Sequence, residues 1–279
     1  MIKMVVCDLD GTLLDKNKEL LEENVEVLKT VQENGVVLVL ATGRNMVGLE
    51  HIYSKLGMDT YNNGYLVTVN GLQRYRFSDK QVIINEGLTR ADVTVVKQAA
   101  AKLGYIAFAF HDNASYISGG RMIHWIMNNS FLQKRLLSSG YDGRLPSPRF
   151  SPYEESFDGV TKMCVQCPTF FLTNSKKVRS LLKDYSVMTV SPGWYEIMPH
   201  GINKSDGVKS IMEELAIDPE EVLIFGDSEN DLEMLKLTPN SYAMDNAMDM
   251  IKEVANHTIS SHNQPGIGQV ILEQIKEIR

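Results

Sequence analysis

Short, wholly apolar segments alternate with helical segments at the start of the chain, and this alternation constrains the fold more than any other feature. Residues 2–8 are an apolar, β-branched run ended by Asp8, and residues 36–40 are a second one. Each run is followed by apolar residues at helical spacing, which lie within 21–31 and 49–56. Because a strand that is apolar at every position is buried on both faces, the pattern predicts a parallel sheet with right-handed helical crossovers.

The rest of the chain divides into a middle part without regular alternation and a last part in which strands and helices alternate again. A third strand is expected at 65–69, followed by a hairpin and then by an α+β stretch in which Thr89 and Asp92 form a capping box. The alternation resumes with a helix at 204–215, strands at 222–225 and 242–244, and a closing helix at 268–278. The sequence therefore predicts a doubly wound α/β core, residues 1–85 and 190–279, with an inserted α+β domain, residues 86–189.

Composition excludes several classes of protein. The chain has 28 Lys and Arg against 35 Asp and Glu, a net charge of −7, whereas a nucleic-acid-binding domain usually has a basic face. No run of about 18 apolar residues predicts a membrane span. Three cysteines are too few for a disulfide framework and favour a reducing compartment. We therefore expect a soluble cytoplasmic protein that binds neither nucleic acid nor membrane; its oligomeric state is not indicated.

Polar residues follow the predicted strands directly, where ligands of open parallel sheets bind. Asp8 and Asp10 come after the first strand, and Thr42 and Gly43 come after the second. The strand at 222–225 is followed by a loop that contains two more acids and a neighbouring amide, and Lys204 opens the preceding helix; the loop residues are Asp227, Asn230 and Asp231. We expect these side chains to converge at one edge of the sheet.

The acidic residues in this set predict a metal site. Asp8 and Asp10 are two residues apart, and carboxylates so close are unfavourable unless a cation neutralises them or one is protonated. With Asp227 and Asp231 they make four acids without a neighbouring Cys or His, a set that favours Mg²⁺ over Zn²⁺. The alternative is that Asp8–Thr12 is a surface turn rich in turn-forming residues.

The remaining residues predict an anion site. A Thr42 hydroxyl together with the free N–H groups of a helix N-terminus can bind an anion. Lys204 is expected to open a helix, where the helix dipole disfavours a cation. An anionic ligand would explain this position.

In order along the chain, Asp8–Thr12, Thr42–Arg44, Lys204 and Gly226–Asp231 resemble the four motifs of the haloacid dehalogenase superfamily. The inserted segment and the pair Asn70-Gly71 resemble its Cof-like subfamily, Mg²⁺-dependent phosphatases of small phosphorylated metabolites. The motifs lie in the two core segments, and the insert matches by position and α+β character only.

This resemblance implies a role for each matching residue. Asp8 would be the nucleophile that forms an aspartyl-phosphate, and Asp10 would be the general acid and base. Mg²⁺ would be held by Asp8, the backbone carbonyl of Asp10, and Asp227, with Asp231 supporting the site. The residues implied to bind phosphate or substrate are Leu9, Thr42, Gly43, Lys204 and Asn230.

One position departs from the family pattern, and two other functions stay open. The family's Met-Gly-Asn-Ala reads Met244-Asp245-Asn246-Ala247 here, so Asp245 adds a carboxylate and reduces backbone freedom. A sugar phosphomutase would use the same aspartyl-phosphate. A non-catalytic metabolite-binding protein is the third possibility, although it would not need the pair Asp8 and Asp10.

Overall fold

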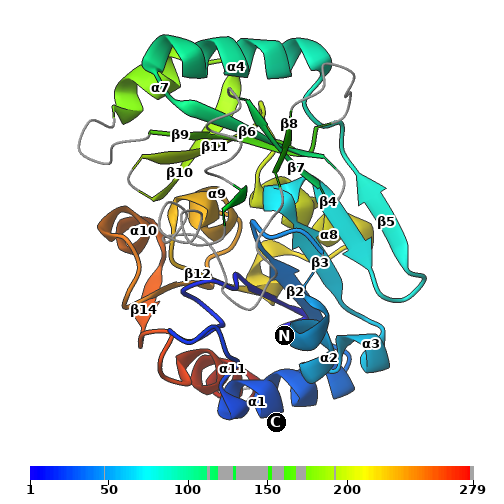
Figure 1. Cartoon of the computed structure of the whole chain (residues 1–279). Helices are drawn as coiled ribbons and strands as arrows, with labels where there is room; N and C mark the ends of the chain where they lie inside the picture. The colour runs from blue at the N-terminus through cyan, green and yellow to red at the C-terminus, as the bar shows by residue number, and fades with distance from the viewer. Residues whose placement is uncertain are drawn as a thin grey trace. The chain divides into compact units, whose positions relative to one another are not determined.

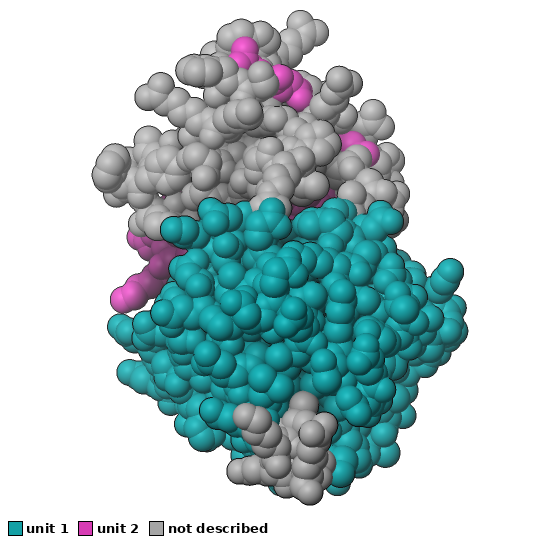
Figure 2. Space-filling view, turned by 90° about the horizontal axis from the view of Figure 1, so that it is seen from below, with its two compact units in different colours: residues 1–85, 203–279 teal, residues 86–202 magenta. Residues whose placement is uncertain are grey.

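The chain forms two compact units (Figures 1 and 2). The computed structural model describes residues 1–46, 48–111, 114–118, 128–129, 150–152, 160–167, 174–191 and 193–276. Unit 1 comprises residues 1–85 and 203–279, and unit 2 comprises residues 86–202. The sequence-based boundary at 190 differs from this division, because residues 194–199 form a strand that pairs within the sheet of unit 2.

An eight-stranded sheet forms the centre of unit 1, with strand order β14-β13-β12-β1-β2-β3-β4-β5. Neighbours from β14 to β3 run parallel, and β4 and β5 continue the sheet as an antiparallel hairpin. The strands are β1 (Met4–Cys7), β2 (Val37–Ala41), β3 (Tyr65–Thr68), β4 (Gln73–Arg76), β5 (Gln81–Ile84), β12 (Val222–Gly226), β13 (Ser241–Met244) and β14 (His257–Ile259).

Helices cover both faces of this sheet, which is why its central strands are apolar at every position. Val5 and Cys7 of β1 belong to one apolar cluster, and Met4 and Val6 belong to the other. Helices α1 (Glu22–Glu33), α2 (Glu50–Lys55), α3 (Met58–Tyr61) and α11 (Gly266–Lys276) contribute to the first cluster. Helices α8 (Lys204–Leu215), α9 (Leu232–Leu235) and α10 (Asp249–Val254) contribute to the second. The expected doubly wound α/β core is confirmed.

Short 3₁₀ segments connect some of these elements. They are η1 (Val69–Gly71), η3 (Pro219–Glu221) and η4 (Glu229–Asp231). Strand β14 was not expected from the sequence. It is an edge strand whose residues are exposed or half-buried, so it lacks the apolar run that marks the central strands.

Unit 2 contains a six-stranded, mostly antiparallel sheet in the order β10-β11-β9-β6-β7-β8. Its strands are β6 (Ile106–His111), β7 (Ala114–Ser118), β8 (Phe150–Pro152), β9 (Lys162–Gln166), β10 (Tyr185–Ser191) and β11 (Trp194–Pro199). Helices α4 (Arg90–Leu103) and α7 (Ser175–Leu181) pack on it through one apolar cluster. The expected capping box is present: the Thr89 hydroxyl accepts from the Asp92 amide, and the Asp92 carboxylate accepts from the Thr89 amide.

Helix α8 is fixed close to the sheet at its first turn. The side chain of Asn203 caps it by accepting from the amides of Ser205 and Asp206. Gly207 lies against β3, where an added Cβ would be 2.6 Å from a methyl of Val67. This close approach buries Lys204 at the helix start. Among the helices that the structure describes, none has the length and apolar character needed to cross a bilayer.

Candidate active site

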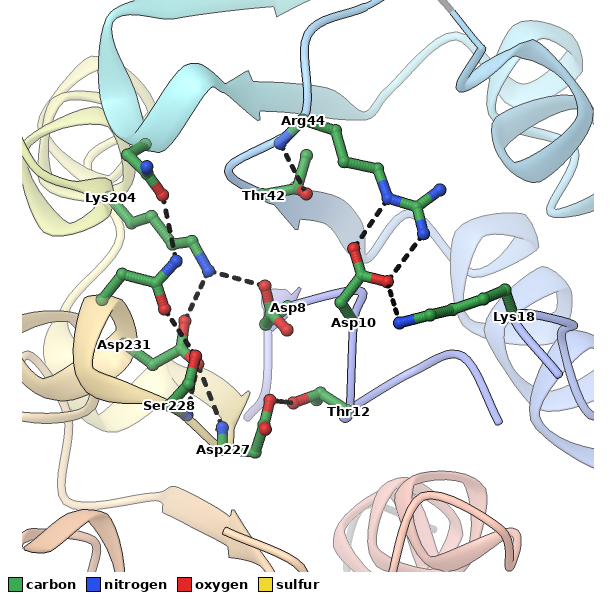
Figure 3. A network of polar contacts seen from close by, with 12 residues as sticks. Asp8, Asp10, Thr12, Lys18, Thr42, Arg44, Lys204, Asp227, Ser228 and Asp231 are labelled. Carbon is green, nitrogen blue, oxygen red and sulfur yellow. Dashed lines mark hydrogen bonds and ion pairs between the residues drawn. The ribbon is translucent and has the colours of Figure 1, made fainter. Parts of the chain in front are cut away.

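The predicted residues of unit 1 meet where β1, β2 and β12 end (Figure 3). Asp8 directly follows β1, and its amide donates to the carbonyl of Phe225 in β12 at 3.1 Å. Asp8 is only 4% exposed. Because β1 is a central strand, the Asp8 carboxylate lies where the apolar core ends and a polar cluster begins.

Lys204 joins two of the buried carboxylates. Its Nζ donates to Oδ1 of Asp8 at 2.6 Å and to Oδ1 of Asp231 at 2.6 Å. All three side chains are almost fully inaccessible to solvent. Because an ammonium without a partner would be very costly at this depth, the position of Lys204 is explained by these two carboxylates.

Asp231 also organises the loop after β12. Its Oδ2 accepts from the amides of Asp227 and Ser228, each at 3.0 Å. These two bonds turn the loop so that Asp227 is placed next to the first loop of the chain, where the Thr12 hydroxyl donates to Oδ1 of Asp227 at 2.8 Å. Asp231 thus holds Lys204 and the loop together, while Oδ2 of Asp227 accepts no hydrogen bond from the described part of the chain.

The cluster carries more negative charge than Lys204 neutralises. Burial raises the pKa of Asp8 well above its usual range, and the carboxylates of Asp231 and Asp227 add to this rise although Lys204 opposes it. Burial and the Asp231 carboxylate raise the pKa of Asp227 to about 6, against the Thr12 hydrogen bond. For Lys204, burial lowers the pKa, but the two carboxylates outweigh it and the pKa is raised.

These residues fit a hard divalent cation. Carboxylate oxygens of Asp8, Asp227 and Asp231 lie within 4.8 Å of one another. The donor set is oxygen only, as Mg²⁺ prefers. Burial, with repulsion between the carboxylates added to it, raises the pKa values of Asp8 and Asp227, and a cation between them would stabilise both ionised forms.

Asp10 does not join this cluster through its carboxylate. Its two oxygens accept a fork of hydrogen bonds from Arg44, with Nε to Oδ2 at 2.7 Å and Nη2 to Oδ1 at 2.7 Å. Lys18 donates from Nζ to Oδ1 at 2.5 Å, and Figure 3 shows the carboxylate turned toward both cations. Burial raises the pKa of Asp10, but Arg44 and Lys18 outweigh it and lower the pKa to about 2. In this arrangement Asp10 is a carboxylate.

Thr42 and Gly43 lie at the end of β2, beside a strained turn. The Thr42 hydroxyl accepts from the amide of Arg44 at 3.2 Å, which leaves its proton available to a ligand. An added Cβ at Gly43 would lie 3.0 Å from the side-chain oxygen of Asn70. Val69 has a φ of 49° and Asn70 one of 53°, which is an unfavourable conformation for a β-branched residue.

Asn230 reaches the same turn from the loop after β12. Its Nδ2 donates to Oδ1 of Asn70 at 3.0 Å, and its Oδ1 accepts from the Ser228 hydroxyl at 2.6 Å. The structure therefore brings Asn230 to the end of β2 and β3. Both polar groups of its amide are already used by neighbours.

Two sequence positions are clarified by their surroundings. The Leu9 side chain is fully buried in the first apolar cluster, so only its main chain is available to a ligand. Asp245 does not have positive φ, and its carboxylate side chain is 72% exposed and lies 3.6 Å from Lys252. The aspartate is accommodated without backbone strain.

Several contributors were not assigned a role from the sequence. Thr12 and Arg44 belong to the motifs named above, and their positions just after strands were the available signal. Lys18 lies in a turn outside any motif, with a left-handed φ of 63°, and nothing in the sequence singled it out. Ser228 contacts Asn230 and Asp231 within its own loop, whereas Asn70 meets Asn230 across 160 positions of the chain.

The sheet and the polar edge described above define a doubly wound α/β protein with an oxygen-lined candidate metal site at the carboxyl ends of its strands. Residues 5–271 match the haloacid dehalogenase-like hydrolases, and the chain belongs to this family. The family and the hydrolase class expected from the sequence are confirmed.

Individual relatives cover nearly the whole chain. YxeH of Bacillus subtilis is 25% identical over 279 residues, 99% of each chain. The HMP-PP phosphatase of Klebsiella pneumoniae is 25% identical over 259 residues, which are 92% of this chain and 89% of that protein. The solved structure of BT1666 from Bacteroides thetaiotaomicron, a phosphatase of this superfamily, has a TM-score of 0.79 at 21% identity and covers 98% of this chain and 95% of its own. This last likeness concerns the fold.

Proposed function

We propose that the protein is a Mg²⁺-dependent phosphomonoesterase that hydrolyses a small phosphorylated metabolite through an aspartyl-phosphate on Asp8. The observation that carries this proposal is the buried Asp8 carboxylate at the end of the central strand, bonded to Lys204 and within 4.8 Å of the Asp227 and Asp231 carboxylates. A nucleophilic carboxylate, a cation and a divalent-cation site at one point are what phosphoryl transfer requires.

The cation would be held by Asp8, Asp227 and the backbone carbonyl of Asp10. Asp231 would support the site through Lys204 and the loop amides. When bound, Mg²⁺ neutralises charge on the transferring phosphoryl group and favours the ionised form of Asp8. The raised pKa values of Asp8 and Asp227 support this assignment, since burial and neighbouring carboxylates disfavour their ionised forms and a cation would stabilise them.

The remaining residues would bind the phosphoryl oxygens. Lys204 already bonds the nucleophile at 2.6 Å and supplies a fixed positive charge beside it. The Thr42 hydroxyl and the amides of Leu9 and Gly43 would donate to the other oxygens. Asn230 would contribute beside the substrate, which requires that its amide exchange the bond to Asn70 for one to the ligand.

The chemistry proceeds in two steps that both involve Asp10. First, an Asp8 oxygen attacks phosphorus, the bond to the substrate oxygen breaks, and a proton from Asp10 goes to that leaving oxygen. Second, water attacks the phosphorus of the aspartyl-phosphate, Asp10 takes its proton, and inorganic phosphate leaves Asp8. The pairing of Asp10 with Arg44 and Lys18 suits the second step. The first step requires Asp10 to gain a proton, so these contacts must loosen before it.

Unit 2 would act as the cap that selects the substrate. It is a separate α+β unit inserted between the two segments of the core in the sequence. The HMP-PP phosphatase relative supports a small phosphorylated metabolite as substrate. The three cysteines form no disulfide in the described part of the chain, which supports a cytoplasmic location, and the net charge of −7 argues against nucleic acid as a partner.

Phosphate release from a panel of sugar phosphates and phosphorylated cofactors, measured with Mg²⁺ and with EDTA, tests this proposal. We expect Mg²⁺-dependent release by the wild type and none by Asp8→Asn, with unchanged far-ultraviolet circular dichroism. The matched control is Asp59→Asn, which makes the same change at an exposed position on α3. Retained Mg²⁺-dependent release by Asp8→Asn would refute the mechanism, and formation of an isomeric sugar phosphate without phosphate release would identify a mutase instead.

A further inference from the structure

Strand β5 at the end of the eight-stranded sheet exposes a row of apolar residues. Val82, Ile83 and Ile84 are 47%, 36% and 62% exposed. Among the described strands of unit 1, β5 closes one side of the sheet and pairs only with β4. Proteins usually protect such edges with short strands, charges, prolines or bulges; β5 is short, but residues 81–84 contain neither a charge nor a proline.

The backbone of β5 presents donors and acceptors that the described residues of the chain leave unused. The Asn85 amide donates to the Leu72 carbonyl at 2.8 Å, so the backbone N–H and C=O groups of residue 85 point toward β4. Hydrogen-bonded and non-hydrogen-bonded pairs alternate in an antiparallel ladder. The backbone groups of Ile83, which lies opposite Arg74, therefore also point toward β4. The N–H and C=O groups of Val82 and Ile84 therefore point away from the sheet.

We propose that β5 of one molecule pairs antiparallel with β5 of a second copy around a two-fold axis at Ile83. In this register Val82 of each copy faces Ile84 of the other, and their outward N–H and C=O groups form the inter-strand hydrogen bonds. The two Ile83 side chains meet on the axis. A two-fold contact of this kind is self-complementary, as homodimer interfaces must be.

Charge complementarity selects this register and this partner. The charged residues that flank the strand are Lys80 on one side and Glu86 on the other, and both are exposed. Lys80 ends the turn before β5, with a φ of 59°, and Glu86 lies two residues beyond the strand, so antiparallel pairing brings the Lys80 end of β5 in one copy beside the Glu86 end of β5 in the other, twice. A partner with a different sequence would need to supply the same polarity, whereas a second copy supplies it by symmetry.

The contact is small, so the dimer is weak. Stable interfaces bury more than about 1,000 Å², and a short strand pair buries less. We therefore expect a dissociation constant on the order of 100 µM. Such a dimer forms only at high protein concentration and does not depend on catalysis.

Sedimentation velocity of the full chain from about 5 µM to about 1 mM tests the proposal. We expect a monomer–dimer equilibrium that Ile84→Lys weakens at least about tenfold. Lys80→Glu and Glu86→Lys each place like charges opposite one another and weaken it about three- to tenfold, while the double variant restores it. Leu272→Lys on α11, at a position 41% exposed, is the matched control and leaves the equilibrium unchanged.

Three results would overturn the proposal. A wild type that stays monomeric at the highest concentration would leave β5 without the proposed occupant. A dimer unaffected by Ile84→Lys would use another surface. Failure of the double charge reversal to restore association would exclude the register. Because circular dichroism melting of each variant reports folding separately, a misfolded variant cannot be mistaken for a monomeric one.

Discussion

Replacing Asp227 by asparagine should stabilise the metal-free protein while removing its response to Mg²⁺. Asp227 lies in a cluster with the Asp8 and Asp231 carboxylates, whose oxygens are within 4.8 Å of one another. Asparagine keeps the shape of the side chain and an oxygen that can accept from the Thr12 hydroxyl, which donates at 2.8 Å in the wild type. The substitution therefore removes the charge and leaves the packing intact.

The expected gain follows from the pKa of Asp227, which rises from 3.8 to about 6. A tenfold change in proton affinity corresponds to about 1.4 kcal/mol, so ionising this group in the folded state lowers the free energy of unfolding by about 3 kcal/mol. Solvent contact of the half-buried side chain reduces this to about 1–3 kcal/mol. The wild type loses this stability as pH rises from about 4 to about 6, and the variant does not.

Urea unfolding followed by far-ultraviolet circular dichroism, in EDTA and in Mg²⁺, measures the effect. At pH 7 in EDTA the variant should be more stable than the wild type, and the difference should disappear near pH 4. Mg²⁺ should stabilise the wild type through binding and leave the variant unchanged. Asp245→Asn is the matched control, because it makes the same change in charge at a side chain that is 72% exposed.

Two results would refute this reasoning. If Asp227→Asn is less stable than the wild type at pH 7 in EDTA, the carboxylate contributes more through hydrogen bonding than it costs through repulsion. If Mg²⁺ stabilises both proteins equally, Asp227 does not bind the cation.

Three further substitutions test other parts of the site. Lys204→Met leaves two buried carboxylates without their ammonium and should lower the free energy of unfolding by about 3–5 kcal/mol in urea at pH 7; a variant of wild-type stability would contradict the role of this ion pair. Arg44→Lys keeps the charge but loses the fork on Asp10, which supports the second step; since the aspartyl-phosphate is the same for every substrate, kcat should fall about 10- to 100-fold for an alkyl phosphate and for p-nitrophenyl phosphate alike, and a loss confined to the alkyl phosphate would show that the fork acts in the first step instead. Gly71→Ala, at a φ of 100°, places a Cβ 2.1 Å from the carbonyl before Lys204 and should cost more than about 2 kcal/mol in thermal unfolding, whereas Gly35→Ala, at a φ of 83° with open space around it, should cost about 1 kcal/mol; similar losses would mean that strain alone decides the effect.

The core of the fold, and most of the residues that meet at its edge, could be predicted from the amino-acid sequence. Strands buried on both faces must be apolar at every position, so β1, β2 and β12 could be predicted from continuous runs of apolar residues. Parallel strands end at a common edge, so the residues directly after them had to converge. Local chemistry also fixed the start of α4, because a capping box involves residues only three apart.

The tertiary structure alone decided which charges pair. Lys204 meets Asp8 across 196 positions of the chain, and Asp10 turns to Arg44 and Lys18 rather than to the acidic cluster. It also assigned residues 194–199 to unit 2 by strand pairing, and it formed β14 at the sheet edge from a segment without an apolar run. The physical reason is the same in each case: an apolar pattern reports burial, whereas an ion pair or an edge-strand pairing depends on which distant segment the packed core brings alongside.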